Sequence, residues 1–193
     1  MNNTTQRTDP RVLRTRQLLR DAVIELLEEM DIEKISVNRI AERAKINRVT
    51  FYLHYRDLPD MLEKMADEMV EDILQVVNND SNHDESVDEE NLRILESLLK
   101  HIAENAKFYK VILTSKRSPI FTDRLFNLMA EIISAHQEKK EGAVDHSKVP
   151  IQKDIAVWYG SAALIGTVIS WLRDDMPYTP VYLARQISML RAN

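Results

Sequence analysis

Residues 36–55 place two short helix-forming segments on either side of a tight turn, and this arrangement constrains the fold more than any other part of the chain. Ser36 can cap a helix over VNRIAERA, and Asn47 can cap a second helix over RVTFYLHY, because their side chains accept hydrogen bonds from the first free amides of a helix. Between these helices, Lys45 and Ile46 leave room only for a turn. Two short helices joined in this way are typical of a helix-turn-helix.

The second helix of this pair is apolar on two faces. Phe51 and Tyr55 are spaced i, i+4 and therefore share one face, which can pack on a core. Val49, Tyr52 and Leu53 point the other way, although a soluble protein gains nothing from exposing them to water. The outer face therefore predicts a binding surface. The predicted core positions are Ile40, Ala41, Ala44, Ile46, Phe51 and Tyr55.

Caps and apolar periodicity predict an all-α chain of about nine helices with no strand. Glycine is scarce, with three residues in 193, and the long segments are rich in residues that tolerate helical geometry. Acidic and polar residues 78–91, and residues 142–149, predict the two main loops. The expected helices cover residues 10–30, 37–44, 47–55, 58–77, 107–114, 119–140, 150–173 and 179–192, with one more running from a capping box at Ser86 and Glu89 to Ile102.

The charge distribution predicts a local anion-binding surface on an acidic protein. The net charge is −5, yet residues 1–20 and residues 36–56 each carry five arginines or lysines against one acidic residue. Charge alone leaves the alternative that these are ordinary solvated helix faces.

Catalytic chemistry finds little support in the sequence. The absence of cysteine excludes disulfides, thiolate metal sites and cysteine nucleophiles. The histidines are dispersed, and none lies in a metal-binding or catalytic motif; they are His54, His83, His101, His136 and His146. We therefore expect no enzyme activity, no cofactor and no metal site.

A soluble cytoplasmic protein is expected. The N-terminus has no apolar signal core, and the most apolar segment, Ala156 to Leu172, falls short of the roughly 20 residues that cross a bilayer. Charged residues flank this segment on both sides, so we expect a buried core helix and no membrane association.

The outer face of the helix over residues 47–55 fits the major groove of DNA. Apolar side chains there can contact thymine methyl groups, and the fork of Arg48 matches the acceptors of guanine. The alternative is a protein-interaction module, in which the same apolar face binds a protein partner. The expected base-facing residues are Arg48, Val49, Tyr52 and Leu53, and the expected phosphate contacts are Ser36, Asn47, Thr50 and His54.

The segment SVNRIAERAKINRVTFYLHYRDLPDML, residues 36–62, resembles the helix-turn-helix of the tetracycline-repressor (TetR) family of bacterial transcription regulators, and the likeness extends back over RTRQLLRDAVIELLEEMDIEKI. The resemblance implies a homodimer that binds a palindromic double-stranded operator, most often as a ligand-responsive repressor. It further implies a DNA-binding domain over residues 1–56 and a regulatory and dimerisation domain over residues 57–193.

Two positions depart from the family pattern. Lys45 occupies a turn position that is commonly glycine, and a positive φ there would cost energy. Leu58 occupies a position that is often a phosphate-binding lysine, so Arg56 or the backbone near Asp57 is the alternative for that contact.

The C-terminal helices predict a dimer interface. Small residues in GSAALIG, residues 160–166, permit close helix approach, so the helices over residues 150–173 and 179–192 would form half of a four-helix interface. The alternative is that the small residues pack inside the subunit. The effector could be a small molecule or a protein partner, and the candidate ligand-binding residues are Phe108, Tyr109, Phe121, Phe126, Met129, Trp158, Tyr159 and Trp171.

Overall fold

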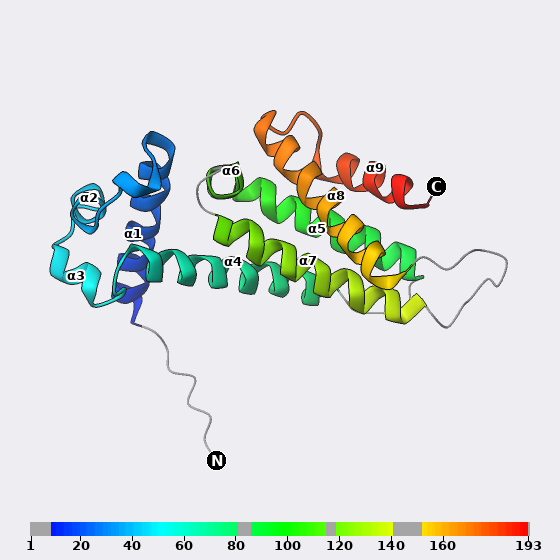
Figure 1. The fold of residues 1–193 in the computed structure, drawn as a ribbon, viewed down its shortest axis with the longest axis horizontal. Coiled ribbons are helices and arrows are strands. Elements are labelled where there is room, and N and C mark those ends of the chain that lie inside the picture. Colours follow the sequence, from blue (N-terminus) through cyan, green and yellow to red (C-terminus); the bar gives the residue numbers. More distant parts are fainter. Residues whose placement is uncertain (1–8, 81–85, 115–118, 141–151, 193) are drawn as a thin grey trace, which may run out of the picture. The chain divides into compact units, whose positions relative to one another are not determined.

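The computed structural model describes residues 9–80, 86–114, 119–140 and 152–192, and within these ranges the chain forms nine α-helices, one 3-10 helix and no strand (Figure 1). The all-α class is thus confirmed. The chain forms two compact units, residues 1–65 and residues 66–193. The helices are α1 (Pro10–Glu29), α2 (Val37–Arg43), α3 (Arg48–Tyr52), α4 (Leu58–Asp80), α5 (Val87–Glu104), α6 (Ala106–Thr114), α7 (Pro119–Lys140), α8 (Lys153–Arg173) and α9 (Pro180–Ala192), with the 3-10 helix at Ile32–Lys34.

An arginine on α2 ties the first two helices of the N-terminal unit together. The guanidinium of Arg43 donates to both carboxylate oxygens of Glu29, at 2.9 and 2.7 Å, and to Glu25 at 3.2 Å. These hydrogen bonds lower the pKa of Glu29 below its usual value and raise that of Arg43. One cation of the basic window at residues 36–56 is therefore neutralised within the unit.

In the turn between α2 and α3, Lys45 adopts the left-handed backbone conformation that is usually found at glycine. Lys45 has φ 55°, its amide donates to the carbonyl of Glu42, and the amide of Ile46 donates to the carbonyl of Ala41. This is the Schellman arrangement that satisfies the last carbonyls of a helix. The expected strain at Lys45 is therefore present, and costs about 1–2 kcal/mol for a residue with a Cβ.

The third helix is shorter than its sequence predicts. It ends at Tyr52 rather than Tyr55, with Leu53 as its C-cap. The amides of His54 and Tyr55 both turn back to the carbonyl of Phe51, so the chain tightens and leaves the helix one turn early. Tyr55 is nonetheless buried, because the tight turn directs its ring to the same core as Phe51.

Two predicted boundaries also move around the first loop. The expected loop over residues 78–91 is too long, since α4 continues to Asp80 and α5 begins at Val87. The capping box is confirmed: Ser86 accepts from the amide of Glu89, and the Glu89 carboxylate accepts from the amide and hydroxyl of Ser86. The second predicted loop, residues 142–149, lies outside the described residues.

The C-terminal unit is a helical assembly in which α5 packs against α9, and α8 packs against α7 and α6 (Figure 1). Aromatic side chains fill part of its core. The ring of Phe108 makes edge contacts with Tyr109 and Phe121, at centroid distances of 5.3 and 6.1 Å. Tyr109 also joins α6 to α5, because its hydroxyl lies 2.9 Å from Nε2 of His101.

The apolar helix α8 is buried on one face only, which corrects the expectation of a core helix. Its buried residues recur every three or four positions, from Val157 to Leu172, while Ile155, Trp158 and Tyr159 are exposed. By length and composition alone α8 could cross a membrane, and it is the one such helix among the described residues. Its buried face already contacts α6 and α7, so only the opposite face is open to a partner.

Candidate nucleic-acid interface

The two apolar faces of α3 have opposite environments. Phe51 is fully buried and Tyr55 is 4% exposed, whereas Val49, Tyr52 and Leu53 are 66%, 45% and 77% exposed. Ile40, Ala41 and Ala44 are buried with Phe51, and Ile46 is only half-buried. The helix therefore uses one side to hold itself on the unit and presents the other side to solvent.

Arg48 and Tyr52 form a joined pair on the exposed face. The guanidinium Nη2 donates to the Tyr52 hydroxyl at 2.8 Å, and Nε approaches the same oxygen at 3.3 Å. The guanidinium carbon lies 5.3 Å from the centre of the Tyr52 ring, within range of a cation–π interaction. The spacing i, i+4 brings the two side chains together, so a change at one will be felt at the other.

The predicted phosphate contacts lie along the edges of the helix-turn-helix. Ser36 accepts from the amide of Arg39 at 3.4 Å, and Asn47 accepts from the amide of Val49 at 2.9 Å, so both act as N-caps. Thr50 and His54 are half-buried. As caps, Ser36 and Asn47 hold the helix starts in place, and their remaining polar atoms are those that a phosphate could contact.

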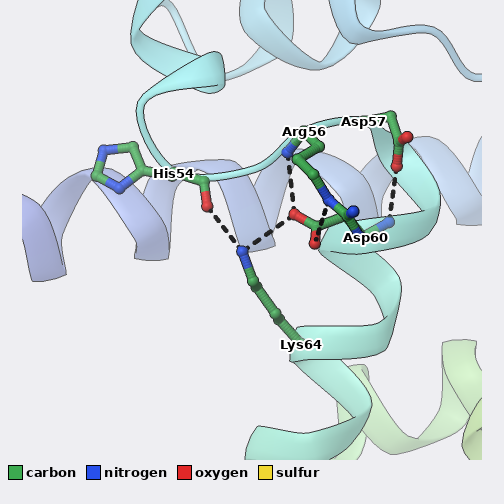
Figure 2. Close-up of polar contacts among 5 residues, drawn as sticks. All are labelled: His54, Arg56, Asp57, Asp60 and Lys64. Carbon is green, nitrogen blue, oxygen red and sulfur yellow. Dashed lines mark hydrogen bonds and ion pairs between the residues drawn. The ribbon is translucent and has the colours of Figure 1, made fainter.

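A polar network, shown in Figure 2, joins the end of α3 to the start of α4. The buried carboxylate of Asp60 accepts from the amide and Nε of Arg56, at 2.9 and 3.2 Å, and from Lys64 at 3.0 Å. These contacts hold the pKa of Asp60 below its usual value, the bond from the Arg56 amide being the largest cause. Sequence reasoning missed Asp60 and Lys64, although the i, i+4 spacing of Arg56, Asp60 and Lys64 was a usable signal.

His54 lies in a positively charged surrounding. Burial, Arg16 on α1 and Lys64 on α4 all lower the pKa of its imidazole below 6.5, and burial is the largest cause. The lowered pKa disfavours the charged form of His54 in the free protein. An approaching phosphate would reverse this balance, since a nearby anion favours the protonated ring.

The eight candidate ligand-binding residues differ in their exposure to solvent. Phe108, Tyr109, Phe121, Met129 and Trp171 are buried, and Phe126 is half-buried. Trp158 and Tyr159 lie on the exposed face of α8. Among the described residues, no group of three His, Asp or Glu side chains could hold a metal ion.

Residues of α8, of α9 and of their connection line an open groove. It has a volume of about 570 Å³, and Trp171 is the one predicted ligand residue that lines it. The indole Nε1 of Trp171 donates to the Tyr178 carbonyl at 2.9 Å, which fixes the connection between the two helices. The other lining residues are Ala162, Ala163, Gly166, Thr167, Ser170, Asp174, Pro177, Tyr178 and Leu183.

The small residues of α8 divide between two environments. A Cβ added at Gly160 would lie 3.3 Å from Cδ1 of Ile133, so this glycine serves the packing of α8 on α7. A Cβ at Gly166 would meet no atom of the described residues within 4 Å. Gly160 therefore packs inside the subunit, Gly166 faces the groove, and the dimer interface predicted from these small residues stays a prediction.

Comparison with known proteins identifies relatives that share this organisation. The uncharacterized HTH-type transcriptional regulator YxbF of Bacillus subtilis (strain 168) is 22% identical over 170 residues, which are 88% of this chain and 42% of YxbF. The chain thus spans less than half the length of that relative. The HTH-type dhaKLM operon transcriptional activator DhaS of Lactococcus lactis subsp. lactis (strain IL1403) is 26% identical over 152 residues, 78% of this chain and 75% of DhaS.

Solved structures share the fold. The transcriptional regulator FadR from Bacillus subtilis, determined in complex with stearoyl-CoA, superposes with a TM-score of 0.67 at 18% identity, covering 90% of this chain and 96% of FadR. The family model TetR_C_8, described as "Transcriptional regulator C-terminal region", matches residues 89–193, more than half of the chain. With a helix-turn-helix ahead of that region, the chain belongs to the TetR family of transcriptional regulators.

Proposed function

We propose that the protein is a homodimeric, sequence-specific DNA-binding regulator that inserts α3 of each subunit into successive major grooves of a palindromic operator. The observation that carries this proposal is the exposed face of α3, where Val49, Tyr52 and Leu53 lie beside Arg48 on a helix that is anchored from its other side. Apolar side chains on such a face suit thymine methyl groups, and the arginine suits guanine. The regulator acts where bacterial DNA is, in the cytoplasm.

The test is a selection of duplexes from a randomised pool with the purified protein. We expect a palindrome whose half-sites lie one helical turn, or a multiple of it, apart, with thymines beside the apolar side chains. Affinity should fall steeply as salt rises, because bound cations on DNA are released. Enrichment of no duplex over random DNA would reject the proposal and favour a protein-interaction role for α3.

The outer face of α8 and α9 supports a homodimer. Eight large apolar side chains on these helices and their connection are exposed, and an exposed apolar surface marks an interaction site. A second copy presenting the same face would cover it and form four packed helices. The exposed apolar residues are Ile155, Trp158, Tyr159, Tyr178, Val181, Tyr182, Met189 and Leu190.

Gly166→Leu is expected to weaken the dimer. Gly166 lies in the groove with open space around it, so a leucine there leaves the subunit intact but overfills a close contact with the second copy. Overpacking of about 1–3 kcal/mol corresponds to a dimer dissociation constant raised by about 5-fold to 150-fold. The measurement is sedimentation equilibrium, with Lys100→Leu, an exposed position on α5, as the matched control. An unchanged dissociation constant for Gly166→Leu would place the interface elsewhere.

DNA binding is expected to strengthen as pH falls through the titration of His54. The pKa of His54 is lowered in the free protein, and a neighbouring phosphate would raise it in the complex. When the pH lies between these two pKa values, DNA binding is accompanied by uptake of a proton. The association constant then rises as pH falls across that window, by at most about tenfold per pH unit per subunit. Fluorescence anisotropy with a random duplex measures this, and His54→Gln should flatten the slope. Equal slopes for both proteins would remove His54 from the phosphate contacts.

We propose that an effector regulates DNA binding through thermodynamic linkage between its own site and the DNA-binding site. A ligand that binds the C-terminal unit and disfavours the DNA-bound arrangement weakens operator binding, and operator DNA weakens ligand binding by the same factor. We propose repression as the main mode, since a dimer covering an operator blocks access to it. Activation is the second candidate, favoured by the relative DhaS, which is named as an activator.

The relative FadR was solved with stearoyl-CoA, which suggests an acyl thioester as one effector to test. Phe108 and Phe121 are candidate ligand-binding residues, and their rings are in edge contact in the core. Stearoyl-CoA, coenzyme A alone and no addition can be compared by thermal unfolding and by operator release. Release by none of them would favour the protein-partner alternative.

A further inference from the structure

We propose that Lys64 is a positioning residue for DNA reading: held by Asp60, its ammonium group fixes the backbone that leaves α3 and so sets the direction in which α3 presents its outer side chains. This inference rests on the proposed function. It concerns a residue outside the predicted DNA-contacting set, on α4 rather than on the helix-turn-helix.

The short length of α3 makes such a residue necessary. A helix of five residues has little stability of its own, because nucleation is costly and few hydrogen bonds form afterwards. Its last carbonyls also lack partners within the helix. Lys64 Nζ donates to the carbonyl of His54 at 3.1 Å, just beyond the C-cap Leu53. A cation at this end both donates a hydrogen bond and interacts favourably with the helix dipole.

Lys64 is itself held in place, as a positioning residue must be. Its ammonium group lies 3.0 Å from Oδ2 of Asp60, one turn earlier on α4, and 5.3 Å from the centre of the Tyr55 ring. A lysine side chain is otherwise long and mobile. Contacts to a carboxylate, a backbone carbonyl and a buried ring limit its movement, although the side chain is 48% exposed.

Asp60 connects the same stretch of backbone to α4 at further points. It accepts from the amide and side chain of Arg56, while its own amide donates to Asp57 at 2.8 Å. In Figure 2 the Lys64 ammonium lies between the His54 carbonyl and the Asp60 carboxylate. The segment from His54 to Asp57 is thereby fastened to the first two turns of α4, and α3 is fixed by this segment as well as by its own buried face.

The positioning role differs measurably from a direct phosphate contact. A lysine bound to phosphate contributes to the slope of log affinity against log salt concentration, and its loss lowers that slope by about one per contact. Its loss also weakens binding to all sequences evenly. Loss of a lysine that orients α3 lowers the affinity for the selected sequence more than the affinity for random DNA. The salt slope then stays unchanged while the ratio of the two affinities falls.

The test compares Lys64→Met, which keeps the aliphatic stem, with Lys64→Arg and with Lys34→Met. Lys34 is an exposed lysine of the same unit, so its loss matches the change in charge. The probes are the duplex that the wild-type dimer enriches from a randomised pool and a random duplex of equal length. For each protein, affinity is measured over a range of salt, and hydrogen exchange is measured for the amides of residues 54–57.

For Lys64→Met we expect faster exchange at residues 54–57 and a selected-to-random affinity ratio lowered by roughly tenfold, the effect of one lost charge-assisted hydrogen bond. The salt slope should not change, Lys64→Arg should recover most of the ratio, and Lys34→Met should resemble the wild type. Three results would overturn the positioning role of Lys64. The first is a lower salt dependence with equal loss of affinity for the selected and the random duplex, and the second is unchanged hydrogen exchange at residues 54–57. The third is faster exchange with an unchanged selected-to-random affinity ratio. Failure of the wild type to select any duplex would instead count against the proposed function, while the exchange experiment still tests the contact itself.

Discussion

Phe51→Ala is expected to lower the free energy of unfolding of the N-terminal unit by about 3–5 kcal/mol. Phe51 is fully buried and contacts the rings of Tyr52 and Tyr55 at centroid distances of 5.5 and 5.6 Å, so its loss leaves a cavity between α3 and the rest of the unit. A unit of 65 residues has a stability of about 3–10 kcal/mol, so much of that stability would disappear. Hydrogen exchange of peptides covering residues 37–55 measures the change locally.

Leu53→Ala is the matched control, two positions along the same segment. Leu53 is 77% exposed, and a substitution at such a site should change stability by less than about 0.5 kcal/mol. It should nevertheless weaken binding to the selected duplex, because the proposed function assigns Leu53 to a thymine methyl group. If both variants lost comparable stability, or Leu53→Ala bound the operator as the wild type does, the division of α3 into an anchoring face and a reading face would be incorrect.

Local signals predicted the helices and the helix-turn-helix well, because short-range chemistry determines them. The predicted caps at Ser36, Asn47 and Ser86 are all observed as side-chain oxygens that accept hydrogen bonds from backbone amides. The spacing of Phe51 and Tyr55 correctly predicted that both are buried, although Tyr55 lies beyond the end of α3. At Lys45 the sequence identified only a position that is commonly glycine, and the structure shows that its φ is positive.

The errors lie where tertiary contacts decide the outcome. The third helix ends early because its chain must turn toward α4, and no residue between Tyr52 and Tyr55 is a helix breaker that would have indicated this. The burial of α8 depends on which neighbours reach it, and a segment that is apolar all round does not reveal that one face remains open. The candidate ligand residues stay a prediction; they were chosen by residue type, which does not separate buried aromatic side chains from exposed ones.

In the candidate nucleic-acid interface, too, some features could be predicted from the sequence and others could not. The exposed positions of α3 could be predicted, because helical periodicity alone separates them from Phe51. The ion pairs could not be predicted from charge counts: Arg43 belongs to a basic window, but it is paired with Glu25 and Glu29 on another helix. Arg56 stays a prediction as a phosphate contact; its side chain is 80% exposed, and Asp60 orients it through Nε.

Arg48→Ala is expected to weaken binding of the selected duplex by about 1–3 kcal/mol per half-site, or roughly 2–6 kcal/mol for a dimer on a palindrome. The loss should be concentrated on one base position of each half-site, because a guanidinium fork recognises guanine specifically. Thr50→Ala, by contrast, should weaken all sequences more evenly. Competition binding with single-base variants of the selected duplex distinguishes the two patterns.

The hydrogen bond between Arg48 and the Tyr52 hydroxyl adds a condition that a double-mutant cycle can test. If Tyr52 orients the guanidinium before DNA arrives, then Tyr52→Phe weakens binding through Arg48 and has little effect once Arg48 is alanine. The effects of the two substitutions should therefore be non-additive by about 0.5–3 kcal/mol, the range for residues in direct contact. Additive losses would mean that Tyr52 contacts DNA independently of the bond at 2.8 Å in the free protein. In that case the two side chains must separate on binding, and the exposed face of α3 rearranges before it reads the groove.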